Sequence, residues 1–115
     1  MFVWEERMNN GNRAELKMEQ NFHVSQEKNK TIYPCTMLKY QASQEIIKLL
    51  LEEGDLTDIS LDAVYECKIF GDNSCLICTG RIKERYQGKD GKTLVLQIQN
   101  GFYKISLKSV DKPNT

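Results

Sequence analysis

The stretch that decides the fold spans residues 80–110 and reads GRIKERYQGKDGKTLVLQIQNGFYKISLKSV. Asp-Gly at 90–91 and Asn-Gly at 100–101 are typical of two-residue hairpin turns. Apolar residues fall at every second position from Leu94 to Ile98, as they do in a strand with one buried side. The stretch therefore predicts a meander of antiparallel strands. We expect these strands at about 75–86, 93–99 and 102–110.

A fourth strand signal precedes this stretch. Apolar residues from Ala63 to Ile69 alternate with polar ones, and residues 71–74 suit a turn. Gly80 predicts a bulge or bend in the long strand that follows. Four short antiparallel strands joined by tight turns favour a small SH3-like or Sm-like barrel. A flat sheet with one helix across it is the alternative.

Residues 43–53 predict the single helix of an α+β fold. Ser43 suits an N-cap, and Gly54 suits the residue that ends a helix. Apolar residues from Ile46 to Leu51 form a stripe at helical spacing. We expect this amphipathic helix to lie against the sheet or to close one end of the barrel.

Residues 1–36 are predicted to form a polar N-terminal arm or hairpin ahead of a helix-plus-barrel domain at 37–115. Alternating residues favour a strand at about 14–24, with a return strand at 31–40. A loosely ordered arm that covers the domain or waits for a partner is the alternative. Met37 opens a compact unit, so a start at that methionine is a further interpretation.

The composition predicts one cytoplasmic domain. A chain of 115 residues suits a single domain, and no apolar run approaches the ~20 residues that span a bilayer. The N-terminus MFVWEERMNN has no basic region followed by an apolar one, so we expect neither export nor membrane contact. The four cysteines are therefore interpreted as reduced thiols.

Charge is unevenly distributed along the chain. Residues 80–112 contain eight Lys/Arg and three acids, whereas residues 1–79 contain eight Lys/Arg and thirteen acids. Such asymmetry favours a polyanionic or acidic partner. Alternate residues of a strand share one side, which predicts a polyanion-binding surface. Its cations would be Arg81, Lys83 and Arg85 on one strand side, with Lys92 and Lys104 from neighbouring strands. The aromatic residues able to stack on bases beside it are Tyr86, Phe102 and Tyr103.

Two other interpretations account for these charges. Lysines and arginines on a solvated strand keep sheet edges from aggregating. The acidic part of the same chain is also able to neutralise the basic part.

Motifs for catalysis or metal binding are weak. Cys75 and Cys78 have CxxC spacing, but strand residues three apart point to opposite sides, so these thiols should pack as small hydrophobes. His23 is the only histidine, in a segment with little predicted structure, which argues against a catalytic triad. Asp55, Asp58 and Asp62 lack the ligand spacing of a calcium loop and suit capping and turns. We predict no enzyme, no metal and no cofactor.

Two segments resemble PilZ domains, which bind a cyclic dinucleotide. Residues 58–63 (DISLDA) resemble the D-x-S-x-x-G element, with Ala63 in place of the glycine. Residues 81–85 (RIKER) match R-x-x-x-R, which precedes the D-x-S element in that family but follows it here. The resemblance implies a site formed by Asp58, Ser60 and a pair of arginines.

A longer segment, about residues 44–110, resembles the YolD-like family of small proteins from Gram-positive bacteria and their phages. The shared features are a helix followed by a meander, a kink at Thr79-Gly80 and a closing strand that ends in the step Leu107–Val110. The family's basic and aromatic N-terminal signature is reduced to Trp4. Members resemble accessory proteins encoded beside translesion DNA polymerases. The resemblance implies a non-enzymatic partner-binding module.

Taken together, these patterns predict a non-enzymatic adaptor that binds a protein or a single-stranded nucleic acid through its basic strand surface. One alternative is a degenerate PilZ-type sensor of a cyclic dinucleotide. The other is a structural module that self-associates, as a homodimer, through an uncovered sheet edge or an apolar helix stripe.

Overall fold

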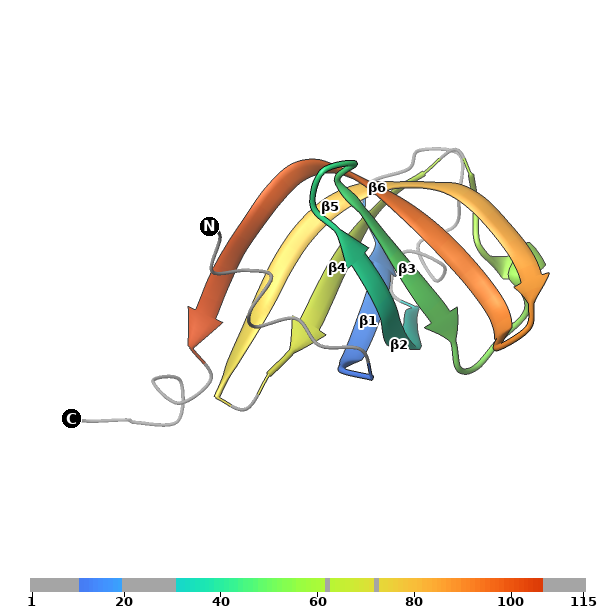
Figure 1. Ribbon diagram of the computed structural model, residues 1–115, viewed down its shortest axis with the longest axis horizontal. Helices are drawn as coiled ribbons and strands as arrows, with labels where there is room; N and C mark the ends of the chain where they lie inside the picture. The colour runs from blue at the N-terminus through green and yellow to red at the C-terminus, as the bar shows by residue number, and fades with distance from the viewer. Residues whose placement is uncertain (1–10, 20–30, 62, 72, 107–115) are drawn as a thin grey trace.

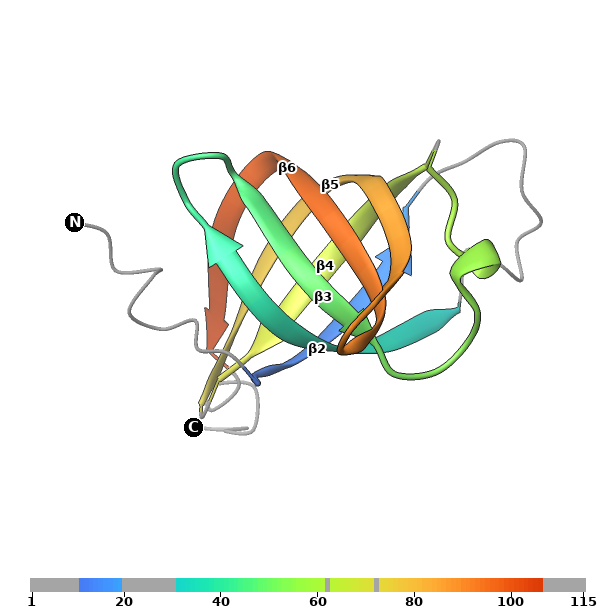
Figure 2. The same ribbon diagram turned by 45° about the vertical axis from the view of Figure 1, so that its right-hand side comes forward.

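The computed structural model describes residues 11–19, 31–61, 63–71 and 73–106, which form a closed barrel of six antiparallel strands (Figures 1 and 2). The order around the barrel is β1-β2-β3-β6-β5-β4. The strands are β1 (Arg13–Met18), β2 (Ile32–Gln41), β3 (Ile46–Leu51), β4 (Val64–Phe70), β5 (Ser74–Gly88) and β6 (Gly91–Ser106). A three-residue 3₁₀ turn, η1 (Leu56–Asp58), lies between β3 and β4. In this part of the chain, no helix has the length and hydrophobicity needed to cross a membrane.

The predicted helix at 43–53, and with it the α+β class, is wrong. A six-residue segment with five apolar residues is too short to distinguish a repeat of 2 from one of 3.6. β3 pairs with β2 on one edge and with β6 on the other, so its backbone is hydrogen-bonded within the sheet. Residues 42–45 form the turn before it, with Glu45 at φ 57°. The inward side chains of β3 are Ile47, Leu49 and Leu51. The helix implied by the YolD-like resemblance is likewise a strand.

The prediction of four strands is also wrong. Asn100-Gly101 is not a turn, because Gly101 lacks the positive φ of a primed hairpin. The two strands predicted at 93–99 and 102–110 are one strand, β6, as far as Ser106, and the residues beyond it lie outside the described ones. β1, β2 and β3 provide three further strands. A small β-barrel is confirmed, with six strands in place of an SH3-like four.

Other local predictions are confirmed. β5 and β6 form the predicted hairpin, although its two turn residues are 89–90, and Gly91, at φ +131°, pairs with Gly88 as the first residue of β6. The amide of Gly71 donates to the carbonyl oxygen of Ser74 at 2.9 Å, which closes the turn between β4 and β5. β1 and β2 pair as the expected N-terminal hairpin, while the predicted strand residues after 19 lie outside the described ones. Both strands belong to the same barrel as β3 to β6, and β2 runs continuously through position 36.

Gly80 is where β5 bends across β6. The two strands curve together over the barrel (Figure 1), and their register shifts between Thr79 and Gly80. A Cβ atom at position 80 would overlap the carbonyl oxygen of Gln97 and lie 2.9 Å from its carbonyl carbon. The expected bend at Gly80 is confirmed, and it depends on the missing side chain.

We predict that Gly80→Ala lowers the free energy of unfolding by about 1–3 kcal/mol, because the added methyl group overlaps the backbone of β6. Gly101→Ala is the matched control, since a Cβ there meets no atom within 4 Å. Urea denaturation measures both variants. Equal stability of the two would contradict the close approach at Gly80.

Candidate functional site

A β-bulge at Lys83 divides the predicted basic strand side. Before the bulge, Arg81 lies opposite Gln97, and its exposed side chain is on the outer side of the barrel. After the bulge, Arg85 lies opposite Leu94, a fully buried core residue. One inserted residue exchanges the two sides for all residues that follow. The prediction that Arg81, Lys83 and Arg85 share one side is therefore wrong.

Arg85 holds the connection between β3 and β4. Its Nη1 donates hydrogen bonds to the carbonyl oxygens of Leu56, at 3.2 Å, and Ile59. Lys92 holds the same connection: its Nζ donates to the carbonyl oxygen of Gly54 at 2.6 Å and lies 3.4 Å from the carboxylate of the next residue. Arg85 and Lys92, two of the predicted polyanion-binding cations, thus have partners within the chain.

The segment that resembles the PilZ D-x-S element lies in this connection. The carboxylate of Asp58 accepts the amide hydrogen of Asp55 at 2.9 Å and so caps η1, which confirms the capping role expected of these two residues. The amide of Ser60 donates to the hydroxyl of Tyr65 at 2.9 Å. Burial raises the pKa of Tyr65, so this hydroxyl stays neutral while it accepts that bond.

The three predicted stacking residues lie in different surroundings. Phe102 packs edge-on against Tyr40, with ring centroids 5.5 Å apart, at the margin of the core. Tyr103 is 54% exposed, but it and Lys104 lie roughly 25 Å along β6 from the bulge. Tyr86 is 38% exposed on the outer side, three residues beyond Lys83. Only Tyr86 of the three is therefore close to exposed cations around the bulge.

Two cations that the sequence analysis missed lie on β2 and β3. Lys39 is directly opposite Lys48, on the outer side of the barrel. Lys48 is opposite Val95 of β6, and Val95 is opposite Glu84 of β5, the residue directly after Lys83. Lys39, Lys48, Lys83 and Arg81 therefore share the outer side of β2, β3, β6 and β5. We call these four residues the basic barrel face.

The basic barrel face brings like charges together. Like charges directly opposite on neighbouring strands destabilise a sheet, and Glu84, adjacent to Lys83 at the bulge, offsets part of the charge. Lys48 was not predicted to belong to this surface because residues 43–53 were expected to form a helix. The lysine between Ile47 and Leu49 was the available signal, but the pairing with Lys39 depends on strand register.

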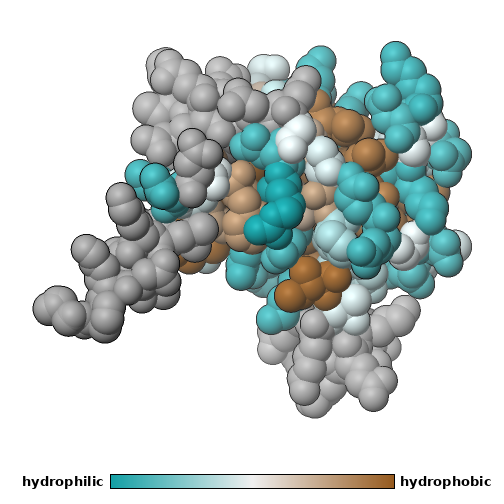
Figure 3. Space-filling view, turned by 90° about the horizontal axis from the view of Figure 1, so that it is seen from below, coloured by the Kyte–Doolittle hydropathy of each residue, from teal (hydrophilic) through white to brown (hydrophobic). Residues whose placement is uncertain are grey.

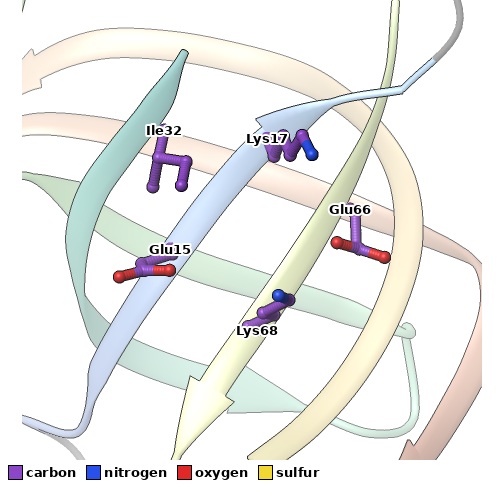
Figure 4. A pocket seen from close by; sticks show the side chains of 5 residues that line it. All are labelled: Glu15, Lys17, Ile32, Glu66 and Lys68. Atoms are coloured by element: carbon purple, nitrogen blue, oxygen red, sulfur yellow. The ribbon is translucent and has the colours of Figure 1, made fainter. Parts of the chain in front are cut away.

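On the outer side of β1 and β4, each charged side chain lies opposite one of the other sign (Figure 4). Glu15 is opposite Lys68, and Lys17 is opposite Glu66. Together with Ile32 of β2, these side chains line a shallow hollow. Opposite charges across neighbouring strands attract, so these four charges balance. Substitutions on this side of the barrel can therefore serve as controls for substitutions on the basic barrel face.

The four cysteines are buried. Cys78 belongs to the core, whereas Cys75 lies on the outer side of β5, which confirms that the CxxC thiols point to opposite sides. Burial raises the pKa of Cys35 to about 12. Within the described residues, no three Cys, His, Asp or Glu side chains gather as metal ligands would.

Apolar side chains on the side shown in Figure 3 reach the surface in separate areas between hydrophilic ones.

Comparison with known proteins finds no family model, no curated protein and no solved structure that matches this chain. The resemblances to PilZ domains and to the YolD-like family therefore stay predictions.

We predict that Arg85→Met lowers the free energy of unfolding by about 1.5–3 kcal/mol, because two carbonyl oxygens of the β3–β4 connection lose a charged donor. Lys83→Met is the matched control, because this side chain is exposed, and we expect a change within about 0.5 kcal/mol. Thermal unfolding compares the two. A similar loss in both variants would argue against a specific role for Arg85.

Proposed function

We propose that this chain is a non-enzymatic accessory module that binds single-stranded nucleic acid on the basic barrel face. The observation that carries the proposal is the direct opposition of Lys39 and Lys48 across β2 and β3. Repulsion between them costs stability, and a bound polyanion would relieve it. Solubility alone would be served as well by alternating charges of the kind found on β1 and β4.

The arrangement of the four cations suits an extended ligand. Adjacent strands lie about 4.8 Å apart, so the face from β2 to β5 is about 14 Å wide. A single strand of nucleic acid that crosses these strands would pass Lys39, Lys48 and the bulge in turn. Tyr86 lies on the same side, and its exposed ring is able to stack on a base. Phosphate contacts would supply affinity, and stacking would tolerate any sequence.

We predict that a mixed-sequence single-stranded oligonucleotide binds with a slope of about −3 in log K against log salt concentration. Each of four cations contributes about −0.7 for a single strand. Lys39→Glu combined with Lys48→Glu should lower the affinity about tenfold or more and flatten the slope, because phosphate contacts are lost. Fluorescence anisotropy at several salt concentrations measures both quantities.

Lys17→Glu combined with Lys68→Glu is the matched control, since it changes the net charge equally on the side with balanced charges. The proposal requires this variant to keep most of the affinity. Equal losses in the two double variants would show that only net charge matters. A wild-type protein that binds no oligonucleotide at low salt would overturn the proposal.

A cyclic-dinucleotide sensor of PilZ type is the second candidate, and the position of the two arginines favours it. Arg85 donates to the carbonyl oxygen of Ile59, the middle residue of the D-x-S segment. Arg81 lies opposite Val64, the first residue of the strand that follows this segment. The two motifs therefore meet at one end of the barrel, although their order along the chain is reversed.

For this candidate we predict that calorimetry with a cyclic dinucleotide detects binding that Arg81→Ala removes, because a phosphate ligand is lost. Arg81→Ala leaves the contacts of Arg85 with the β3–β4 connection in place. Lys104→Ala, on the distant part of β6, is the control and should bind normally. A silent titration at high protein concentration removes the candidate without bearing on oligonucleotide binding.

A further inference from the structure

Three of the four cysteine side chains lie inside the barrel. Cys35 of β2, Cys67 of β4 and Cys78 of β5 belong to the buried core, and at most 1% of each residue is exposed. Cys75 lies on the outer side of β5. The CxxC spacing therefore joins two thiols that point apart, whereas strand pairing places Cys78 beside Cys67.

Cys67 and Cys78 are directly opposite each other in the register of β4 and β5. Directly opposed residues of antiparallel strands have Cα atoms about 4.5–5.5 Å apart, which is within the roughly 4.4–6.8 Å that a disulfide needs. Both side chains also belong to the buried core, so the two thiols lie on the same side of the sheet. The backbone is therefore already placed for a bond between the two sulfurs.

The other two cysteines have no cysteine opposite them. Cys35 lies opposite Ala14 of β1 and Leu51 of β3. Cys75 lies opposite Phe70 of β4. Of the pairings that four cysteines allow, direct opposition across the sheet therefore selects one.

We propose that Cys67 and Cys78 are an oxidation site whose product is a cross-strand disulfide that joins β4 to β5 inside the barrel. With glutathione disulfide as the oxidant, one cysteine thiol loses its proton, attacks, and forms a mixed disulfide as one glutathione leaves. The second cysteine then displaces the other glutathione. The two thiols lose two protons and two electrons, and the oxidant becomes two molecules of reduced glutathione.

The closed barrel controls when this reaction takes place. Cys67 is 0% and Cys78 1% exposed, so glutathione has no path to either sulfur in the folded protein. The neighbouring Cys78 thiol, together with burial, raises the pKa of Cys67, and the thiolate is the species that attacks. Oxidation therefore requires that β4 and β5 open, or that the chain is still folding. Whether this cysteine pair is a dithiol or a disulfide then depends on the redox conditions under which the barrel formed.

The test compares two samples of the full-length chain, prepared differently, in the same excess of glutathione disulfide. One sample is reduced and folded throughout, and the other is unfolded in urea and then refolded. We expect the refolded sample to lose two hydrogen atoms by intact mass, with Cys67 linked to Cys78 in the peptide map. We expect the folded sample to form the disulfide at least about tenfold more slowly than the refolded sample. The disulfide should raise the Tm by roughly 10 °C, and a reductant should reverse this increase.

Cys75→Ser is the matched control and should oxidise as the wild type does, because its thiol lies on the outer side. Cys67→Ala should form no such disulfide, and if this variant fails to fold, the wild-type peptide map decides alone. A disulfide to Cys75 or Cys35, or free thiols at both proposed positions after oxidative refolding, would overturn the assignment. Equally fast oxidation of the folded sample would overturn the control by barrel closure.

Discussion

Closure of the sheet is the constraint on which the rest of this structure depends. The six strands form a barrel because β3 pairs with β6 on one side and β1 pairs with β4 on the other. A sheet closes only if its strands bend, and here they bend at Gly80 and at bulges beside Leu38 and Lys83. Closure encloses a single core to which all six strands contribute. The bulges therefore decide which side chains enter that core and which lie outside it.

The bulge at Lys83 shows how this constraint sorts the charges. Arg81 and Lys83 stay on the outer side, where closure brings them onto the same surface as Lys39 and Lys48. Arg85, two residues further on, is turned toward the end of the barrel and holds the β3–β4 connection instead. β5 thus supplies cations with two different roles. Arg81 and Lys83 belong to the proposed binding surface, whereas Arg85 stabilises the end of the barrel.

The parts of the fold that the sequence predicts are those that depend on neighbouring residues. The β5–β6 hairpin is one of them, because a glycine with positive φ suits the residue directly after a tight turn, and Gly91 is that residue. The alternation of β4 is visible because polar residues separate its apolar ones. β3 was mistaken for a helix because a single polar residue, Lys48, separates its apolar ones, and pairing on both edges decides its conformation. The candidate site was predicted only in part for the same reason, since Lys48 belongs to that strand and its neighbour Lys39 comes from another.

By itself, the sequence determined the strand alternation after residue 63, the turn at Gly91 and the bend at Gly80, because each of these follows from local backbone preferences. The tertiary structure decided that β3 is a strand, that Arg85 lies on the inward side and that Cys67 meets Cys78. These features depend on the register between strands, and a shift of one residue in register would place the opposite set of side chains in the core. Register is set by closure of the whole barrel, which no short stretch of sequence specifies.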